Sequence, residues 1–165
     1  MREDFAEFVV ARQSQWLRTA HLLSGDRQFA EDIVQQSLEK LYVVWPKVVG
    51  VGAPDAYVRK MILNVYLSET RRAWRRRERT SEDVAPAVVQ PGSAPLDDRI
   101  DLVRALGALP RRQRAALILR FAEDLSVAET AAVMGCAEGT VKAHTAAGIK
   151  ALRRSMDLHC VGVTE

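Results

Sequence analysis

Basic side chains with one tryptophan among them fill a short stretch in the first half of the chain, and they offer the chemistry of nucleic-acid binding. The segment RRAWRRRER covers residues 71–79. A guanidinium group pairs with phosphate oxygens, and an indole ring stacks on an unpaired base. Arginines at a helix end are also favoured by the negative pole of the helix dipole. We therefore predict a nucleic-acid surface that includes Arg71, Arg72, Trp74 and Arg75, with a solvated helix end as the alternative.

The segment directly before these arginines is predicted to be an amphipathic helix that begins at Pro54. Apolar residues at positions 58, 61, 62 and 65 form its buried stripe. Tyr57, Lys60 and Asn64 lie off that stripe. The Asn64 carboxamide offers both a donor and an acceptor to a base edge. The alternative for Asn64 is a polar residue on a solvated helix face.

A second candidate lies between Ser126 and Leu152, where the sequence is typical of a helix-turn-helix. Ser126 and Glu129 have the spacing of a capping box, which begins a helix, and Gly135 can end that helix in the left-handed conformation. In the following helix Val141 is expected to point inward. The polar residues expected to point outward are Lys142, His144 and Lys150. The second helix of such a pair reads base pairs in the major groove of duplex DNA.

Composition and charge place these candidates in a small helical protein. The 165 residues carry a net charge of +3, and 48% are hydrophobic and 27% charged. This composition is globular, and its alanine, leucine and arginine content favours helices. Residues 80–96 are rich in proline, lack a helical period and are typical of a linker. The prediction is an all-α fold of two small helical domains, residues 1–79 and 97–165.

Capping and breaking residues predict where the helices of the first domain begin and end. Asp4 is expected to cap the first helix, and Ser24-Gly25-Asp26 separates it from the second. Trp45-Pro46 is expected to end the second helix, so that residues 49–53 form a glycine-containing loop. The first domain is therefore expected to contain three helices.

The second domain is expected to begin with Asp97 and Asp98 at a helix N-terminus. Pro110 is expected to end this helix and to start the next. The apolar body of that next helix, which extends to Phe121, is expected to pack against the helix-turn-helix.

Other sequence features limit the compartment and the chemistry. The N-terminal segment MREDFAEFVV is acidic and lacks the pattern of a secretory signal, and no apolar run reaches membrane-spanning length. Cys136 and Cys160 are therefore expected to be reduced thiols in the cytosol. His159 and Cys160 have no closely spaced ligand pair beside them, so we expect no metal and no cofactor. No phosphate-binding loop or nucleophile pattern favours an enzyme.

Several strings of residues together resemble the extracytoplasmic-function (ECF) sigma factors of bacterial RNA polymerase, in the SigE-like subgroup of the sigma-70 superfamily. AEDIVQQ at residues 30–36 resembles the family's polymerase-binding helix, with Gln36 in place of the usual acid. YVRKMILN at residues 57–64 resembles its promoter-melting helix, and residues 48–53 resemble its base-capturing loop. LPRRQR at residues 109–114 and GTVK at residues 139–142 are similar to its most recognisable strings in the second half.

The resemblance implies a dissociable initiation subunit without catalysis of its own, located in the cytoplasm at the nucleoid. It implies that the first domain docks on the β′ clamp of core RNA polymerase and that the second docks on the β flap. The implied polymerase-binding residues are Asp32, Gln35, Gln36 and Leu38. The residues implied to open the minus-ten element of promoter DNA are Tyr57, Arg59, Lys60, Asn64, Arg71, Arg72, Trp74 and Arg75. The residues implied to contact the minus-thirty-five element are Arg112, Thr140, Lys142, Ala143, His144, Ala146, Ala147 and Lys150.

The second helix of the helix-turn-helix departs from the family pattern in two ways. Alanines occupy positions 143, 146 and 147, where polar or basic residues are usual, and Ala137 replaces the usual serine cap. Few side chains are left to hydrogen-bond base edges, so DNA shape is expected to contribute to selectivity. Members of this family are often held by an anti-sigma protein, which is a further expected partner. No insertion into a membrane is expected.

Two other classes of protein compete with this interpretation. Residues 140–144, followed by Ile149 and Leu152, also resemble the helix-turn-helix of LuxR-type transcriptional regulators. The three amphipathic helices expected in the first half argue against it, because a receiver or sensor domain would show strand alternation. A pure protein-interaction module is the third interpretation. It predicts that Arg71, Arg72 and Arg75 can be neutralised without loss of promoter opening.

Overall fold

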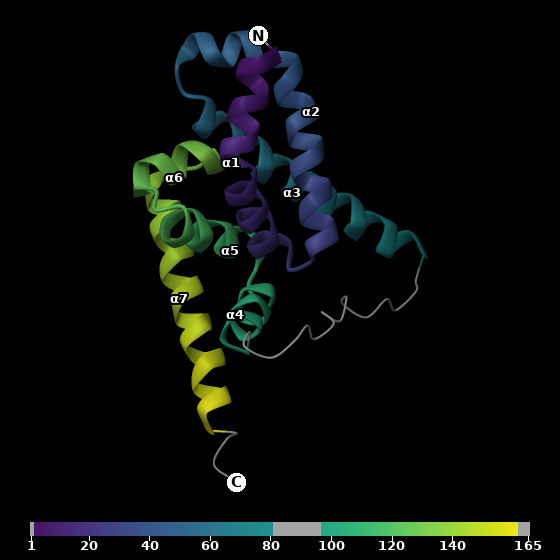
Figure 1. The fold of residues 1–165 in the computed structure, drawn as a ribbon. Coiled ribbons are helices and arrows are strands. Elements are labelled where there is room, and N and C mark those ends of the chain that lie inside the picture. The colour runs from purple at the N-terminus through teal and green to yellow at the C-terminus, as the bar shows by residue number, and fades with distance from the viewer. Residues whose placement is uncertain (1, 81–96, 162–165) are drawn as a thin grey trace. The chain divides into compact units, whose positions relative to one another are not determined.

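The computed structural model describes the backbone of residues 2–80 and 97–161 and the side chains of residues 2–69 and 101–157. Every element in these ranges is a helix (Figure 1), which confirms the predicted all-α fold. The chain divides into two compact units, Met1–Gln90 and Pro91–Glu165. None of the described helices is long and apolar enough to cross a membrane. Residues 81–96 of the predicted linker lie outside the described part of the chain.

Three long helices make the first unit, and each packs against the other two. They are α1 (Arg2–Ser24), α2 (Arg27–Val51) and α3 (Pro54–Thr80). Their apolar stripes meet in one core, because burying these faces removes apolar surface from water. Its most deeply buried large side chains include Leu23, Ile33, Leu41, Ile62 and Tyr66.

The turn between α1 and α2 forms where the sequence predicts it. Gly25 has a φ of 71°, a left-handed conformation that glycine adopts without steric cost. Asp26 then caps α2, and its Oδ1 accepts hydrogen bonds from the backbone N–H groups of Gln28 and Phe29 at 2.8 and 3.2 Å. The predicted cap of α1 is wrong, because this helix has already begun at Arg2 and Asp4 lies in its first turn.

Pro46 does not end α2, contrary to the sequence prediction. The helix continues to Val51 with the proline inside it, and Gly52, with a φ of 76°, caps its C-terminus. Proline removes one helical hydrogen bond and crowds the preceding turn. Trp45 and Val48 on either side of it are 6% and 4% exposed, and their burial requires the helical course. The connection to α3 is therefore the two-residue turn Gly52–Ala53 and not the longer predicted loop.

The second unit begins with two helices joined at a proline. Helix α4 (Asp97–Gly107) is followed by α5 (Arg111–Leu117), with Pro110 at the α5 N-terminus as predicted. The Nη2 atom of Arg114 donates hydrogen bonds to the carbonyl oxygens of Gly107 and Leu109, at 2.8 and 3.1 Å. These carbonyls at the end of α4 lack helical partners of their own. Arg114 thus fixes the corner between α4 and α5.

A π-helical turn, η1 (Ile118–Ala122), follows α5 directly. Its backbone bond runs from the Glu123 N–H to the Ile118 carbonyl oxygen, at 3.0 Å. A π-turn inserts an extra residue relative to the α-helical spacing and so rotates the residues after it. The apolar body of this segment packs on the helix-turn-helix as expected, with Ala116, Leu117 and Leu119 buried. Phe121 after the π-turn is 62% exposed, so the expectation is wrong for this residue.

The helix-turn-helix consists of α6 (Val127–Met134) and α7 (Glu138–Val161). The predicted capping box is present, with the Glu129 N–H donating to Ser126 Oγ at 3.1 Å and the Ser126 N–H donating to Glu129 Oε2 at 3.2 Å. Gly135 ends α6 with a φ of 66°. Val141 is fully buried, as expected. Helices α5 and α6 both pack on α7 and cover its inner face.

Candidate nucleic-acid interfaces and a docking groove

One face of α3 gathers three of the predicted minus-ten residues. Tyr57, Lys60 and Asn64 are exposed, and their spacing of three and four residues places them in one row along the helix. Arg59 is half-buried and lies outside this row. It lies five residues from Asn64, which is a rotation of about 140° around an α-helix. The aromatic ring, the ammonium group and the carboxamide are therefore the described part of this candidate surface.

The arginine-rich part of the same candidate belongs to the same helix. The backbone of residues 70–80 continues α3 without a break. The side chains of Arg71, Arg72, Trp74 and Arg75 lie outside the described residues. Of the side chains on this candidate surface, the structure therefore describes those of residues 57, 60 and 64.

An ion pair between α1 and α3 holds the start of this helix. The Nε atom of Arg12 lies 2.6 Å from Oδ1 of Asp55, and both side chains are a little over one-third exposed. Asp55 is in the first turn of α3, where a carboxylate also favours the positive pole of the helix dipole. Sequence reasoning did not find this pair, because its members are far apart in the chain and have no local spacing rule.

The outer face of α7 carries most of the predicted minus-thirty-five residues. The exposed ones on this helix are Thr140, Lys142, Ala143, Ala146, Ala147 and Lys150. Arg112, near the start of α5, is exposed too. His144 is half-buried, and its helical position places it toward the packed side, so the expectation that it points outward is wrong. The outer face is thus formed mainly by alanine methyl groups with two lysines and one hydroxyl at its borders.

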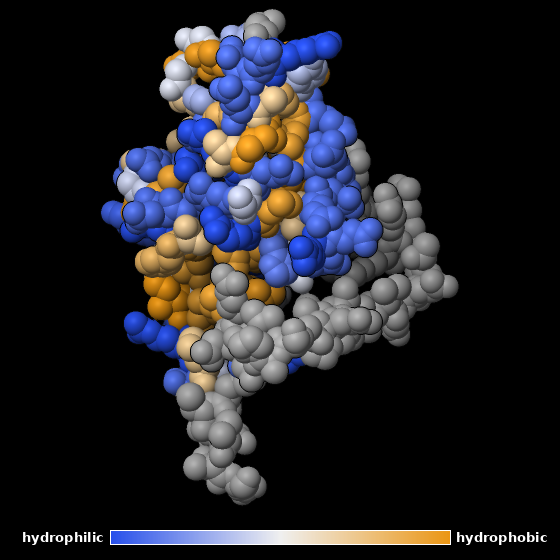
Figure 2. All heavy atoms as spheres, in the orientation of Figure 1, coloured by the Kyte–Doolittle hydropathy of each residue, from blue (hydrophilic) through white to orange (hydrophobic). Residues whose placement is uncertain are grey.

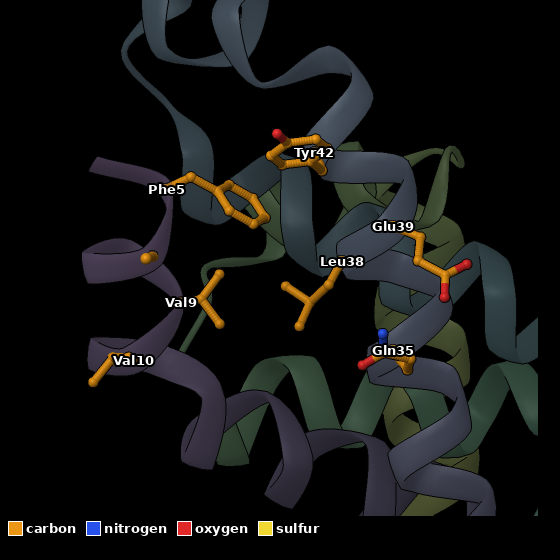
Figure 3. Close-up of a pocket in the computed structure, with 8 residues that line it drawn as sticks. Phe5, Val9, Val10, Gln35, Leu38, Glu39 and Tyr42 are labelled. Carbon is orange, nitrogen blue, oxygen red and sulfur yellow. The ribbon is translucent and has the colours of Figure 1, made fainter. Parts of the chain in front are cut away.

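An open groove of about 530 Å³ lies between the N-terminal half of α1 and the middle of α2. Phe5 and Val9 point from α1 toward Leu38 and Tyr42 on α2 (Figure 3). Apolar surface is visible between these two helices, bordered by hydrophilic residues (Figure 2). Val10, which also lines the groove, is 77% exposed. Large apolar side chains left open to water in this way mark a surface for binding another molecule.

The groove contains two of the four predicted polymerase-binding residues. Gln35 and Leu38 line it, whereas Asp32 is exposed one turn before it on α2. Gln36 is half-buried and does not line the groove, because it lies about 100° around the helix from Gln35. Sequence reasoning missed the contribution of α1 and of Tyr42, since the groove exists only once the two helices are paired.

A cluster of aromatic rings packs beside and below the groove. The ring of Phe5 lies 5.2 Å from both Tyr42 and Trp45, edge to face. Phe8 continues the cluster, with its ring 5.0 Å from Trp45 and 5.4 Å from Trp16. Such edge-to-face and tilted arrangements suit the quadrupoles of the rings and add to the energy of burial. These contacts hold the two aromatic rings of the lining, Phe5 and Tyr42, in place.

Comparison with known protein families assigns both units. Residues 8–76 match Sigma-70 region 2, and residues 99–152 match Sigma-70, region 4. The RNA polymerase sigma-E factor of Streptomyces avermitilis is 32% identical over 154 residues, which are 93% of this chain and 86% of that protein. The ECF RNA polymerase sigma factor SigM of Mycobacterium tuberculosis is 30% identical over 162 residues, 98% of this chain and 82% of the relative. The LuxR-type interpretation finds no support in these matches.

Solved structures agree with the sequence relatives. The sigma factor RpoE of Bartonella quintana, solved in complex with the anti-sigma factor NepR, has a TM-score of 0.78 and 28% identity, covering 94% of this chain and 98% of that one. CnrH, solved with the cytosolic domain of CnrY, has a TM-score of 0.69 at 16% identity and shows the shared fold. With both regions matched and relatives aligned over nearly its whole length, the chain belongs to the ECF sigma factors of the sigma-70 family.

Proposed function

We propose that the two units of this sigma factor divide promoter-specific initiation of transcription between them. Residues 1–79 bind core RNA polymerase and open the minus-ten element, residues 97–165 contact the minus-thirty-five element, and residues 80–96 connect the two. The protein works by binding, in the cytoplasm at the nucleoid, while the polymerase performs the chemistry. The observation that carries this proposal is that each unit presents an exposed helical face within the residues that match a Sigma-70 region.

The minus-ten role is supported by the chemistry of the α3 row. Opening a duplex costs stacking energy, and an unpaired base is held by stacking and by hydrogen bonds to its edge. Tyr57, 45% exposed, offers a ring for stacking, and Asn64 two turns further on offers the hydrogen bonds. Lys60 lies between them and offers a positive charge to the phosphate backbone. Arg71, Arg72, Trp74 and Arg75 extend the same role in our proposal.

The minus-thirty-five role is supported by the outer face of α7. Thr140, near the helix N-terminus, and Lys150, in its middle, are placed to hold phosphates on either side of a groove. Between them the exposed methyl groups of Ala143 and Ala147 suit contacts with thymine methyls, and they offer no hydrogen bonds. The selectivity of this element is therefore expected to depend on A·T content and DNA shape.

The occupant that we propose for the α1–α2 groove is a basic amphipathic helix of the polymerase β′ clamp. The lining is apolar, which suits the apolar side of such a helix. Glu39 lines the groove, and Glu3, Glu7 and Asp32 are exposed acids on the same two helices. These charges complement basic residues and increase the rate of association. A protein of the anti-sigma class, as seen bound to the Bartonella quintana relative, is the regulatory partner that we propose for this chain.

Run-off transcription tests the proposal directly. Core polymerase and this protein are incubated with a promoter library randomised at both elements, and the transcripts are sequenced. We expect transcripts that depend on the protein and that share two separated sequence elements. Transcription that does not depend on the protein, or duplex binding without any association with the polymerase, would refute the proposal.

Matched variants assign the minus-ten role to a residue. Asn64→Ala should reduce the preference for one minus-ten base by about ten-fold, which is the discrimination a hydrogen-bonded side chain provides. Gln13→Ala, an exposed polar change on α1, is the control and should leave the selected promoters unchanged. Equal promoter preferences for both variants would remove Asn64 from the interface.

A further inference from the structure

We propose that Arg12 and Asp55 form a clamp that positions the DNA-binding face of α3, which makes both of them positioning residues for promoter opening. The inference rests on the minus-ten role proposed for that face. Neither residue lies in the row formed by Tyr57, Lys60 and Asn64. The clamp acts on that row through the backbone of α3.

The pair is a direct bridge between two helices. Arg12 lies in the middle of α1, and Asp55 is the second residue of α3. The Nε and Oδ1 atoms are 2.6 Å apart, so the two charged groups are in direct contact. A second ion pair, which joins Arg27 to Glu31 inside α2, is longer, at 3.8 Å.

The Arg12 side chain packs against an aromatic ring of its own helix. Its guanidinium carbon lies 4.6 Å from the centre of the Phe8 ring. Phe8 in turn contacts the rings of Trp16 and Trp45, which are 3% and 6% exposed. A cation held over an aromatic face loses little further freedom when it pairs with a carboxylate. The ion pair therefore connects α3 to the buried aromatic cluster of the first unit.

Asp55 lies in the first turn of α3, which sets the direction in which the helix leaves the preceding turn. The helix follows the two-residue turn Gly52–Ala53, and Gly52 has a left-handed backbone. The first helical bond here, from the Tyr57 N–H to the Ala53 carbonyl oxygen, is long at 3.4 Å. The first turn of a helix lacks internal partners for its N–H groups and frays easily. A side-chain contact at Asp55 is thus the means of fixing the turn that presents Tyr57.

A fixed start of α3 matters because promoter opening needs its face in a defined place. A base leaves the stack only if stacking and hydrogen-bonding groups are positioned to receive it. When the clamp is broken, the first turn can fray or tilt, and Tyr57 is affected before Lys60 and Asn64. Opening should slow while attachment to the polymerase, which uses the groove between α1 and α2, remains intact.

A double-mutant cycle tests the clamp with the full-length protein and core polymerase. The variants are Arg12→Gln, Asp55→Asn and the double variant, and the readout is the rate of minus-ten opening, followed by the reactivity of unpaired thymines. A partly exposed ion pair changes an equilibrium by no more than about five-fold. We expect each single variant to slow opening by about that factor and the double variant to be no slower than either one.

Controls separate positioning from folding. Arg27→Gln breaks the exposed pair inside α2 and should leave the rate of opening unchanged. The affinity of the clamp variants for core polymerase should stay within about two-fold, and their Tm should fall by no more than about 4 °C. On a template whose minus-ten element is already unpaired, the variants should recover most of the wild-type rate.

The outcomes distinguish this inference from the proposed function. If the wild-type protein opens promoters and both single variants open them at the same rate, the clamp proposal is wrong and the minus-ten role stands. If the single effects simply add in the double variant, the two residues do not act as a pair. If the wild-type protein itself opens no promoter, the proposed function has failed first.

Discussion

Gly148 of α7 lies directly against Leu117 of α5, so closely that a Cβ atom at position 148 would be 2.8 Å from Leu117 Cδ1 and 3.1 Å from its Cγ. Both residues are buried. The absence of a side chain at position 148 therefore sets how closely the two helices approach. This contact holds the helix that carries the proposed DNA face against the body of the second unit.

Gly148→Ala should destabilise the second unit. Overpacking of a buried contact costs about 1–3 kcal/mol, and the better helix propensity of alanine offsets about 1 kcal/mol of it. The expected net loss is about 1 kcal/mol in the free energy of unfolding. Gly139→Ala on the same helix is the control, because a Cβ there meets no atom within 4 Å. It should leave stability unchanged or raise it slightly.

The two units can be followed separately in this experiment. All three tryptophans of the chain precede residue 91, so tryptophan fluorescence reports on the first unit. Circular dichroism reports on the helices of both units. A lower urea midpoint for Gly148→Ala should therefore appear in circular dichroism and not in fluorescence. An unchanged midpoint would mean that the Leu117 side chain moves to accommodate the new methyl group without a loss of stability.

Thr130→Val should stabilise the helix-turn-helix. Thr130 in α6 is fully buried, and its Oγ1 has no hydrogen-bond partner among the described residues. A buried hydroxyl without a partner costs about 1–3 kcal/mol, and valine has nearly the same shape. We expect a gain of about 1 kcal/mol in the free energy of unfolding, measured by denaturant titration.

Thr145→Val provides the matched control for this substitution. The Thr145 hydroxyl donates to the Val141 carbonyl oxygen at 2.7 Å, so its removal relieves nothing. This variant should be neutral or slightly less stable. If both substitutions had the same effect, the Thr130 hydroxyl would not be the cause.

Asp124→Gly should also stabilise the second unit. Asp124 follows η1 with a φ of 53°, and it is the only non-glycine residue in the described backbone with a positive φ. A side chain in this conformation costs about 1 kcal/mol or more, and glycine removes that cost. The greater freedom of the unfolded chain with glycine offsets part of this gain in stability. We expect a net gain of about 0.5 kcal/mol. Asp124→Ala should be less stable than Asp124→Gly.

The same change elsewhere should have the opposite sign. Asp101 is exposed within α4, where glycine is a poorer helix former than aspartate. Asp101→Gly should therefore lower the free energy of unfolding by a few tenths of a kcal/mol. Stabilisation by both substitutions would show that charge, and not backbone conformation, is responsible.

Features with a local cause were predictable from the sequence. The capping box of Ser126 and Glu129, the left-handed Gly135 and the break between helices at Gly25 depend on residues within four positions of one another. Pro46 was misjudged because the burial of Trp45 and Val48, which depends on the packing of distant helices, overrides the local effect of proline.

The candidate site was predictable to a similar extent. Exposed positions on α3 and α7 follow from helical spacing, which places Asn64 and Lys150 correctly. His144 was placed on the wrong side because its position borders the packed face, where spacing alone decides poorly. The groove and the bridge from Arg12 to Asp55 depend on residues that only the packed helices bring together.

Val10→Arg should weaken binding to core polymerase by about ten-fold. Val10 is 77% exposed at the edge of the groove, so the substitution should not disturb folding. A positive charge there repels the basic helix that we propose as the occupant, and it also occupies apolar surface that the partner needs. Affinity is measured by fluorescence anisotropy of the labelled protein with core polymerase, in the absence of promoter DNA.

Val51→Arg is the control for this experiment, because Val51 is 81% exposed but lies outside the groove. Its affinity for core polymerase should match that of the wild-type protein. High salt should restore part of the affinity lost by Val10→Arg, because it screens the charge repulsion. The rest of the loss should persist, because salt does not screen the apolar contacts. Equal affinities for the two variants would exclude this edge of the groove from the polymerase contact, whereas tighter binding by Val10→Arg would indicate an acidic occupant.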